Sequence, residues 1–227
     1  MKSSSQIVAE ELAAKTIREL NAPPWPQQRS RVWTDPKGCQ YLAVWQNAAL
    51  LRVLVRKFTL TLPLDKTLNK PLEFRLKTQM DDAIRSVKRN IEEGWKRPTT
   101  SEYLTFLGYS QASLEEVKGD IRDCKTDGFL KSQPGSTLTS VGINLKVFKG
   151  AGKGMIKGEP TEKDNPYYRP LIKLKGSSLT YEIFMELINK TDYLLRALVS
   201  SLEKKLNQDQ KTWQIERARI KSNLKVK

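Results

Sequence analysis

Four segments of this chain each carry one apolar stripe at the spacing of an α-helix, and this pattern limits the folds open to it. In the segment 41–62, apolar residues recur every three or four positions: Val44, Ala48, Leu51, Val55, Phe58 and Leu62. Similar stripes run through 71–94, 99–128 and 178–206. A helix with a single apolar stripe is not stable alone in water, because the stripe must be buried against a neighbour. Burying all four stripes together predicts an all-α protein, an antiparallel four-helix bundle.

Proline and glycine set the predicted ends of the first two helices. Pro63 ends the first, since proline has no backbone N–H to donate within a helix. Pro71 is predicted to open the second, where the missing N–H costs nothing, and Gly94 to end it. The links 63–70 and 95–98 are short, which favours adjacent antiparallel helices.

The third helix has the clearest end signals in the chain. Thr99 and Glu102 have the spacing of a capping box, in which each side chain accepts a hydrogen bond from the other's backbone N–H. Gly128 supplies a left-handed stop, and Phe129 and Leu130 are placed to fold back on the last turn. The sequence therefore predicts a helix that begins after Thr99 and ends at Gly128.

The remaining segments do not follow the helical pattern. The predicted map is an N-terminal extension (1–40), bundle helices one to three (41–130), a basic insertion (131–177), bundle helix four (178–206) and a basic tail (207–227). The insertion is rich in glycine and proline, so we expect it to be mobile without a partner and dispensable for bundle folding. Its run 138–148 alternates weakly, which favours a hairpin. The fourth helix is predicted to continue, with frayed and basic character, towards Lys221.

The charge balance indicates a polyanionic partner. The 227 residues include 40 Lys and Arg against 25 Asp and Glu, a formal net charge of +15. The basic excess concentrates in 41–71, 141–176 and 189–227, as expected for one polyanion-facing surface. Nucleic acid is the commonest such partner. The alternative is a charge that only keeps the protein in solution.

The composition argues against an enzyme. The chain has no histidine, which excludes Ser-His-Asp and Cys-His catalysis and every zinc site that uses histidine. Cys39 and Cys124 form no CxxC pair and are predicted to be reduced bystanders rather than a disulfide. The glycine-rich run 150–154 lacks the Ser or Thr that follows the lysine of a phosphate-binding loop. We therefore predict no catalytic residue and no cofactor.

A row of carboxylates on the third helix is the one feature that resembles a metal site. Asp120, Asp123 and Asp127 lie three and four positions apart and share a face. A carboxylate row without histidine is more typical of a solvated face, or of one that pairs with Lys and Arg, so we predict no metal.

No segment has the length and apolar character of a membrane span. The longest charge-free stretch near the first helix, 38–51, contains Gln40, Gln46 and Asn47, and a span needs about 20 apolar residues. The first residues lack a signal-peptide core, because charge returns at Glu10. These features predict a soluble, cytoplasmic protein with no membrane partner.

Rows of basic residues at helical spacing are the candidate nucleic-acid-binding residues, because such rows can follow the phosphates of a strand. They are Arg52, Arg56 and Lys57 on the first helix, Arg85, Lys88 and Arg89 on the second, Lys96 and Arg97 at its end, and Lys146, Lys149, Lys153 and Lys157 in the insertion. The alternative is a set of ordinary solvated helix surfaces.

The second and third helices carry a motif that resembles a known bacterial family. The residues that match it are Gln79-Met80, Ala83, Ser86, Asn90-Ile91, Glu93-Gly94, Arg97, Ser101-Glu102-Tyr103, Phe106-Leu107 and Ala112-Ser113-Leu114 with Glu116. The flanks also match, at Val44-Trp45-Gln46, Phe58-Thr59, Leu62-Pro63, Leu187-Ile188-Asn189-Lys190-Thr191 and Tyr193-Leu194-Leu195. The family comprises four-helix bundles encoded in intervening sequences of large-subunit rRNA genes. It also includes the accessory variability determinant (Avd) of diversity-generating retroelements.

The resemblance implies a function and a set of partners. Avd proteins bind a reverse transcriptase and its template RNA or cDNA, and they assemble as homopentamers with a basic surface. We therefore expect a non-enzymatic accessory protein that forms a ring-like homo-oligomer. Ser86, Asn90 and Gly94, at close-packing positions, are consistent with contacts between bundles. The chain departs from the family pattern at Asp81-Asp82, where Arg-Arg is usual, and at Glu92, where alanine is usual.

Two alternatives belong to other functional classes. The first is a structural oligomer or protein-interaction module of the intervening-sequence type. The second is a component of another defence or mobile-element assembly. A reverse transcriptase gene and a repeated variable region beside this gene would favour the Avd interpretation.

Overall fold

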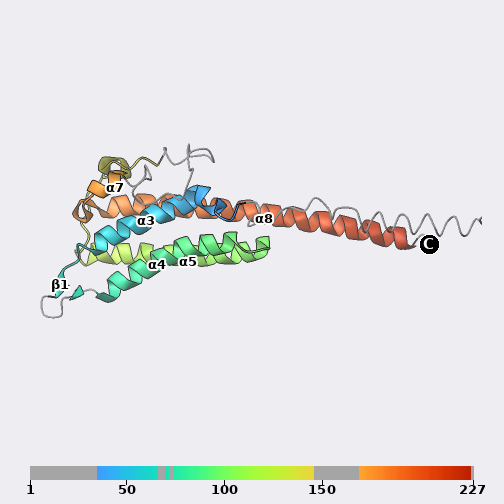
Figure 1. The fold of residues 1–227 in the computed structure, drawn as a ribbon, viewed down its shortest axis with the longest axis horizontal. Helices are drawn as coiled ribbons and strands as arrows, with labels where there is room; N and C mark the ends of the chain where they lie inside the picture. The colour runs from blue at the N-terminus through green and yellow to red at the C-terminus, as the bar shows by residue number, and fades with distance from the viewer. Residues whose placement is uncertain (1–34, 66–69, 72–73, 146–168, 226–227) are drawn as a thin grey trace, which may run out of the picture.

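Four long helices form the body of the protein. The structure is a computed structural model that describes residues 35–65, 70–71, 74–145 and 169–225 (Figure 1). The long helices are α3 (Ala43–Thr59), α4 (Phe74–Trp95), α5 (Thr100–Thr126) and α8 (Tyr181–Lys225). Helix α3 packs on α4, α4 on α5, α5 on α8, and α8 returns to α3. The predicted four-helix bundle is confirmed.

Short elements complete the described chain. The 3-10 turn η1 (Gly38–Tyr41) precedes α3, and η2 (Leu138–Val141), α7 (Arg169–Lys173) and η3 (Gly176–Ser178) lie between α5 and α8. A minimal antiparallel ladder joins β1 (Leu64–Asp65) to β2 (Lys70–Pro71), with Leu64 opposite Pro71. It leaves the all-α class unchanged.

The predicted stripes form the hydrophobic core. One residue from each helix shows the pattern: Leu51, Ile84, Leu107 and Phe184 are all fully buried. The rings of Phe58 and Phe184 meet edge to face, with centroids 5.8 Å apart. The periodicity of the sequence therefore identified the buried face of every bundle helix.

The second helix begins later than predicted. Pro71 belongs to β2, and α4 begins at Phe74. Pro71 lies in a short two-stranded ladder, and proline is tolerated in an edge strand as well as at a helix start. The second helix ends as predicted, because α4 ends at Trp95, one residue after Gly94.

Gly94 lets α4 and α5 approach closely. A Cβ at this position would lie 2.5 Å from the ring of Tyr103 and 2.9 Å from the Cβ of Phe106. The Oγ of buried Ser110 donates a hydrogen bond of 2.9 Å to the carbonyl of Val87, which joins the same two helices. Gly94 thus lies at a close approach of two helices within one bundle, and contacts between bundles stay a prediction.

Both predicted ends of α5 are confirmed. Thr99 and Glu102 form the capping box, with each side chain accepting from the other's backbone N–H. At the other end Gly128 has a φ of 79°, and the N–H of Leu130 donates to the carbonyl of Cys124 at 2.9 Å. Leu130 is buried, so the chain folds back on the last turn.

The start of the insertion is part of the packed bundle. The hairpin predicted for 138–148 is wrong over its described residues, because Leu138–Val141 is a 3-10 turn. A helical carboxylate accounts for the difference: Glu186 of α8 accepts from the backbone N–H of Leu138 at 2.7 Å. Leu138 and Ile143 are buried in the core. Residues 131–145 are therefore not the detached mobile segment that the composition predicted, and residues 146–168 lie outside the described residues.

Helix α8 is much longer than its neighbours. Its 45 residues extend for about 67 Å at a rise of 1.5 Å per residue, against about 40 Å for the 27 residues of α5. Its carboxyl half stands clear of the bundle (Figure 1). The predicted continuation towards Lys221 is confirmed, and the helix runs on to Lys225. Among the residues that the structure describes, every helix is too short or too polar to span a bilayer.

Candidate nucleic-acid interface

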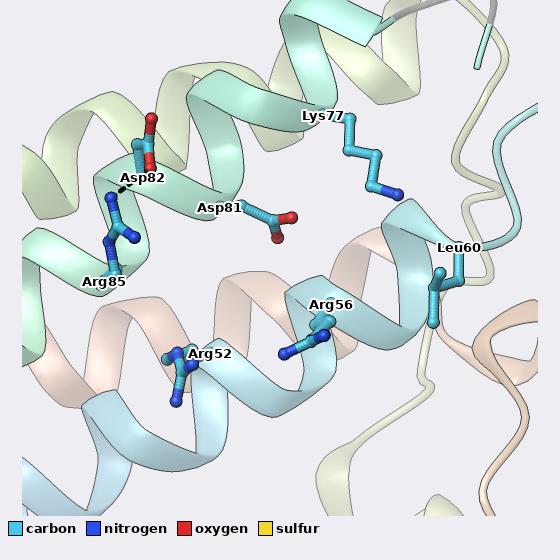
Figure 2. Close-up of a pocket in the computed structure, with 7 residues that line it drawn as sticks. All are labelled: Arg52, Arg56, Leu60, Lys77, Asp81, Asp82 and Arg85. Carbon is cyan, nitrogen blue, oxygen red and sulfur yellow. Dashed lines mark hydrogen bonds and ion pairs between the residues drawn. The ribbon is translucent and has the colours of Figure 1, made fainter. Parts of the chain in front are cut away.

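Helices α3 and α4 form a charged groove on the surface of the bundle. It has a volume of about 280 Å³. Two of its residues come from α3, one is the residue that follows α3, and four come from α4: Arg52, Arg56, Leu60, Lys77, Asp81, Asp82 and Arg85 (Figure 2). We call these seven residues the α3–α4 groove. It brings together three of the predicted binding residues, Arg52, Arg56 and Arg85.

Two rows at helical spacing explain why these side chains converge. Arg52 and Arg56 of α3 and Leu60 at its C-cap are four residues apart, and on α4, Lys77, Asp81 and Arg85 are also four apart. Residues four apart in a helix lie on one face. Helices α3 and α4 pack side by side. The two polar rows flank this contact, and they therefore border the same groove.

The cations of the groove outnumber its carboxylates. Arg85 and Asp82 pair with each other at 2.7 Å, one turn apart on α4. Arg52, Arg56 and Lys77 form no ion pair within 4.0 Å with any described residue, and they surround the single remaining carboxylate, Asp81. The groove therefore carries an unbalanced positive charge.

Asp81 is the resident anion of the groove. Its side chain projects from α4 into the gap towards α3 (Figure 2). Burial raises the pKa of Asp81, and Lys77 and Arg56 oppose that rise. The carboxylate of Asp81 lies within the field of these cations but makes no close ion pair with a described residue. It neutralises their charge only in part.

Two of the predicted binding residues are engaged inside the protein. The Nζ of Lys57 donates to the carbonyl of Leu174 at 3.1 Å, which fastens the segment before α8 to α3. The Nζ of Lys88 pairs with Glu92 at 2.6 Å and lies 5.0 Å from the centre of the Trp45 ring. The indole N–H of Trp45 donates to the same carboxylate at 2.9 Å, so Lys88 joins α3 to α4.

The other predicted residues lie outside the groove. Arg89 and Lys96 are exposed on α4 and just beyond its end. The guanidinium of Arg97 lies over the ring of Phe106, 4.4 Å from its centre. The four lysines predicted for the insertion are outside the described residues: Lys146, Lys149, Lys153 and Lys157.

Lys77 is the groove residue that the sequence analysis missed. The available signal was its spacing, since it lies four residues before Asp81 and eight before Arg85 on the same face. Asp81 and Asp82 stand where the family pattern usually has Arg-Arg. The structure separates their roles, because Asp82 pairs with Arg85 and Asp81 faces the cations of α3.

The carboxylate row of α5 is only partly a solvated face. Asp123 and Asp127 are exposed, but Asp120 is 5% exposed, so the prediction is wrong at this residue. Gln79 donates to its Oδ1 at 2.9 Å, and its buried Oδ2 has no hydrogen-bond partner among the described residues. Burial, together with Asp123 and Glu116, raises the pKa of Asp120 to about 6. The described residues contain no cluster of His, Cys, Asp and Glu suited to a metal ion.

Both cysteines are free and buried. Burial and the neighbouring Glu92 raise the pKa of the Cys39 thiol to about 11. Burial and nearby aspartates, Asp120 first among them, raise the pKa of Cys124 to about 12. A thiol with so high a pKa is a poor nucleophile at neutral pH, as expected for the predicted bystanders.

Comparison with known proteins identifies the bundle. A family model described as 23S rRNA-intervening sequence protein matches residues 40–145, which span η1, α3, α4, α5 and η2. No curated protein and no solved structure gives a significant match. The family match includes the motif on the second and third helices that carried the resemblance. Residues 40–145 of this chain are therefore similar to the 23S rRNA-intervening sequence protein family.

Proposed function

We propose that this protein is a non-enzymatic accessory protein that binds nucleic acid. The observation that carries the proposal is the α3–α4 groove, where Arg52, Arg56 and Lys77 surround a single carboxylate without forming ion pairs to described residues. Cations that are not neutralised by the protein itself are available to the phosphates of a strand. The formal net charge of +15 would attract such a strand from a distance.

The family suggests the setting in which the protein acts. Avd proteins belong to the same group of four-helix bundles and serve a reverse transcriptase. By that likeness, the partners proposed here are a reverse transcriptase and its template RNA or cDNA. A homo-oligomer, a pentamer by the same likeness, would present several copies of the groove to one long strand. Several weak contacts on one strand raise the overall affinity, although each single contact stays the same.

A second function is favoured by a different surface. In the protruding part of α8, Trp213 is 58% exposed and Ile215 is 67% exposed. Tyr193, which lies nearer the bundle, is 72% exposed. Large apolar side chains on an exposed helix are typical of a protein-interaction surface. A structural oligomer or protein-interaction module of the intervening-sequence type is therefore the alternative.

RNA binding by the unmodified protein tests the first function. We expect fluorescence anisotropy to show binding of a labelled single-stranded RNA at 50 mM salt. The slope of log K against log salt should fall by about 0.7 for every phosphate contacted. A protein that is folded by circular dichroism but binds neither RNA nor single-stranded DNA at low salt would contradict the proposal and favour the alternative.

A further inference from the structure

The α3–α4 groove has the arrangement of a site for one anionic group. Arg52 and Arg56 reach into it from α3, and Lys77 reaches into it from α4, on the opposite wall (Figure 2). These three side chains come from two helices, and Lys77 lies 21 residues after Arg56 in the sequence. Their convergence is therefore a product of the fold, whereas a row along one helix would follow from the sequence alone.

We propose that the α3–α4 groove binds one backbone phosphate of a nucleic-acid strand, held by Arg52, Arg56 and Lys77, and that Asp81 is a resident counter-charge with which the phosphate competes. This inference rests on the proposed function and goes beyond it by assigning the contact to one groove and giving one carboxylate a regulatory part. The remaining groove cation, Arg85, is held by Asp82 and is not required.

The helix backbones fix the positions from which the three cationic side chains extend. Arg56 lies between the buried residues Val55 and Phe58 of α3, and Asp81 follows the fully buried Met80 of α4. The turns that carry the charged side chains are therefore fixed by the core. A site whose charges are placed before binding loses less entropy when its ligand arrives.

The chemistry of the groove favours phosphate over other anions. Of the three groove cations that form no ion pair with a described residue, two are guanidinium groups, whose planar forks match the oxygens of a phosphate in a bidentate arrangement. Lysine supplies a third, compact charge from the facing helix. A backbone phosphate carries a single negative charge, so together with Asp81 it brings the site close to balance.

Asp81 should weaken phosphate binding as long as it is ionised. It lies among the same cations that the phosphate would contact, and two negative charges in one groove repel each other. The charged groups that act on Asp81 are Arg52 and Arg56 from α3, with Lys77 and Asp82 from α4. Burial disfavours its ionised form, so protonation or substitution of Asp81 would release the groove for phosphate.

The test compares groove residues with matched residues outside the groove. The probe is a fluorescein-labelled 20-nucleotide oligo(U) RNA, followed by anisotropy at 50 and 150 mM salt. We expect Arg56→Gln and Lys77→Gln each to weaken binding by about 10-fold, as the loss of a charge-assisted contact predicts. The controls Arg122→Gln on α5 and Lys204→Gln on α8 remove the same charge from exposed positions outside the predicted binding set and should weaken binding by less than about 3-fold.

Removal of the Asp81 charge is expected to strengthen RNA binding, and a misfolded variant would not give this result. Asp81→Asn should strengthen RNA binding by about 3-fold to 10-fold, while Asp123→Asn on the exposed face of α5 makes the same change in net charge. The control should show less than half of that gain. Arg56→Lys, which keeps the charge but loses the fork, should bind between wild type and Arg56→Gln.

The outcomes separate this inference from the proposed function. If the groove variants and the exposed controls lose affinity equally, or if Asp81→Asn gains no more than Asp123→Asn, the groove is not the phosphate site although the protein still binds RNA. If the unmodified protein binds no nucleic acid at low salt, the proposed function fails and the inference fails with it.

Discussion

At the scale of single residues, Asp120 is a buried carboxylate whose hydrogen bonds are incomplete among the described residues. It is 5% exposed, it has one hydrogen bond from Gln79, and its Oδ2 is buried without a partner among the described residues. Burial raises its pKa from 3.8 to about 6. The ionised form present at neutral pH is therefore a cost that the packing of α4 on α5 has to offset.

Stability should fall as pH rises through the range in which Asp120 ionises. Its pKa is higher in the folded protein than in the unfolded chain, so the folded protein holds the proton more tightly. The free energy of unfolding should thus decrease between about pH 4 and pH 7, by up to about 3 kcal/mol from this group.

Asp120→Asn should be more stable than the wild type at pH 8, by about 1–2 kcal/mol, and should lack most of this pH dependence. Urea denaturation at pH 5, 6, 7 and 8 measures both effects. Asp127→Asn at the exposed end of the same row is the control and should change stability by less than about 0.5 kcal/mol. Parallel pH profiles for wild type and Asp120→Asn would show that Asp120 has an ordinary pKa.

Two helical glycines offer an experiment in which the same substitution has opposite effects. Gly94→Ala places a Cβ 2.5 Å from the Tyr103 ring, so α4 and α5 must separate, at a cost of about 1–3 kcal/mol. Gly119→Ala in α5 meets nothing within 4 Å, and the better helix former should stabilise the protein by about 0.5–1 kcal/mol. Chemical denaturation measures both. Equal effects at the two positions would contradict the close contact at Gly94.

The sequence revealed some of these residue roles and could not reveal others. The capping box at Thr99 and the left-handed Gly128 are local, so their signals lie within four residues. Lys57 and Lys88 were predicted as binding residues, but their partners Leu174 and Trp45 lie 117 and 43 positions away in the chain. The pair of Lys88 with Glu92, four residues on, has a local signal, but only the fold shows the contacts with Leu174 and Trp45.

At the scale of elements, the segment after α5 is attached to α8 by polar contacts as well as by burial. Glu182 accepts hydrogen bonds from the Ser132 hydroxyl and the Gln133 backbone N–H, and the backbone N–H of Tyr181 donates to the carbonyl of Lys131 at 3.0 Å. These contacts position η2 against α8. The start of the insertion thereby covers one end of the bundle core.

Leu138→Ala should destabilise the protein by about 2–5 kcal/mol, because it empties a fully buried site under η2. Ile172→Ala in α7, where the side chain is 67% exposed, should cost less than about 0.5 kcal/mol. Thermal unfolding followed by circular dichroism compares the two. A Leu138→Ala protein as stable as the wild type would show that 131–145 is not part of the cooperative unit.

Element boundaries followed from the sequence where a single physical rule applied, and failed where two rules competed. Pro71 satisfies both a helix start and a position in an edge strand, and the ladder with Leu64 decided between them. The run at Leu138 has the alternation of a strand, but a carboxylate on α8 stabilises the backbone of a 3-10 turn. The partner that decided each case is not adjacent in the sequence.

At the scale of the whole molecule, the open question is how many copies assemble. The family likeness favours a homo-oligomer, and the exposed residues Tyr193, Trp213 and Ile215 supply apolar surface for contacts between copies or with another protein. Static light scattering at micromolar protein should give a mass several times 26.0 kDa. A monomer over that whole concentration range would contradict the ring-like assembly but would leave the α3–α4 groove untested by that measurement.

Helix α8 also has a mechanical consequence. Its last core residue with full burial is Leu195, and the helix continues to Lys225, about 45 Å further on at 1.5 Å per residue. No glycine or proline interrupts it between Tyr181 and Lys225, so it offers no ready hinge. A force that a partner applies at the far end of α8 would be transmitted along the helix to its packing against α3 and α5. A sideways force at the tip would therefore act as a torque on the packing of α8 against α3, and α3 is one of the two helices that border the α3–α4 groove.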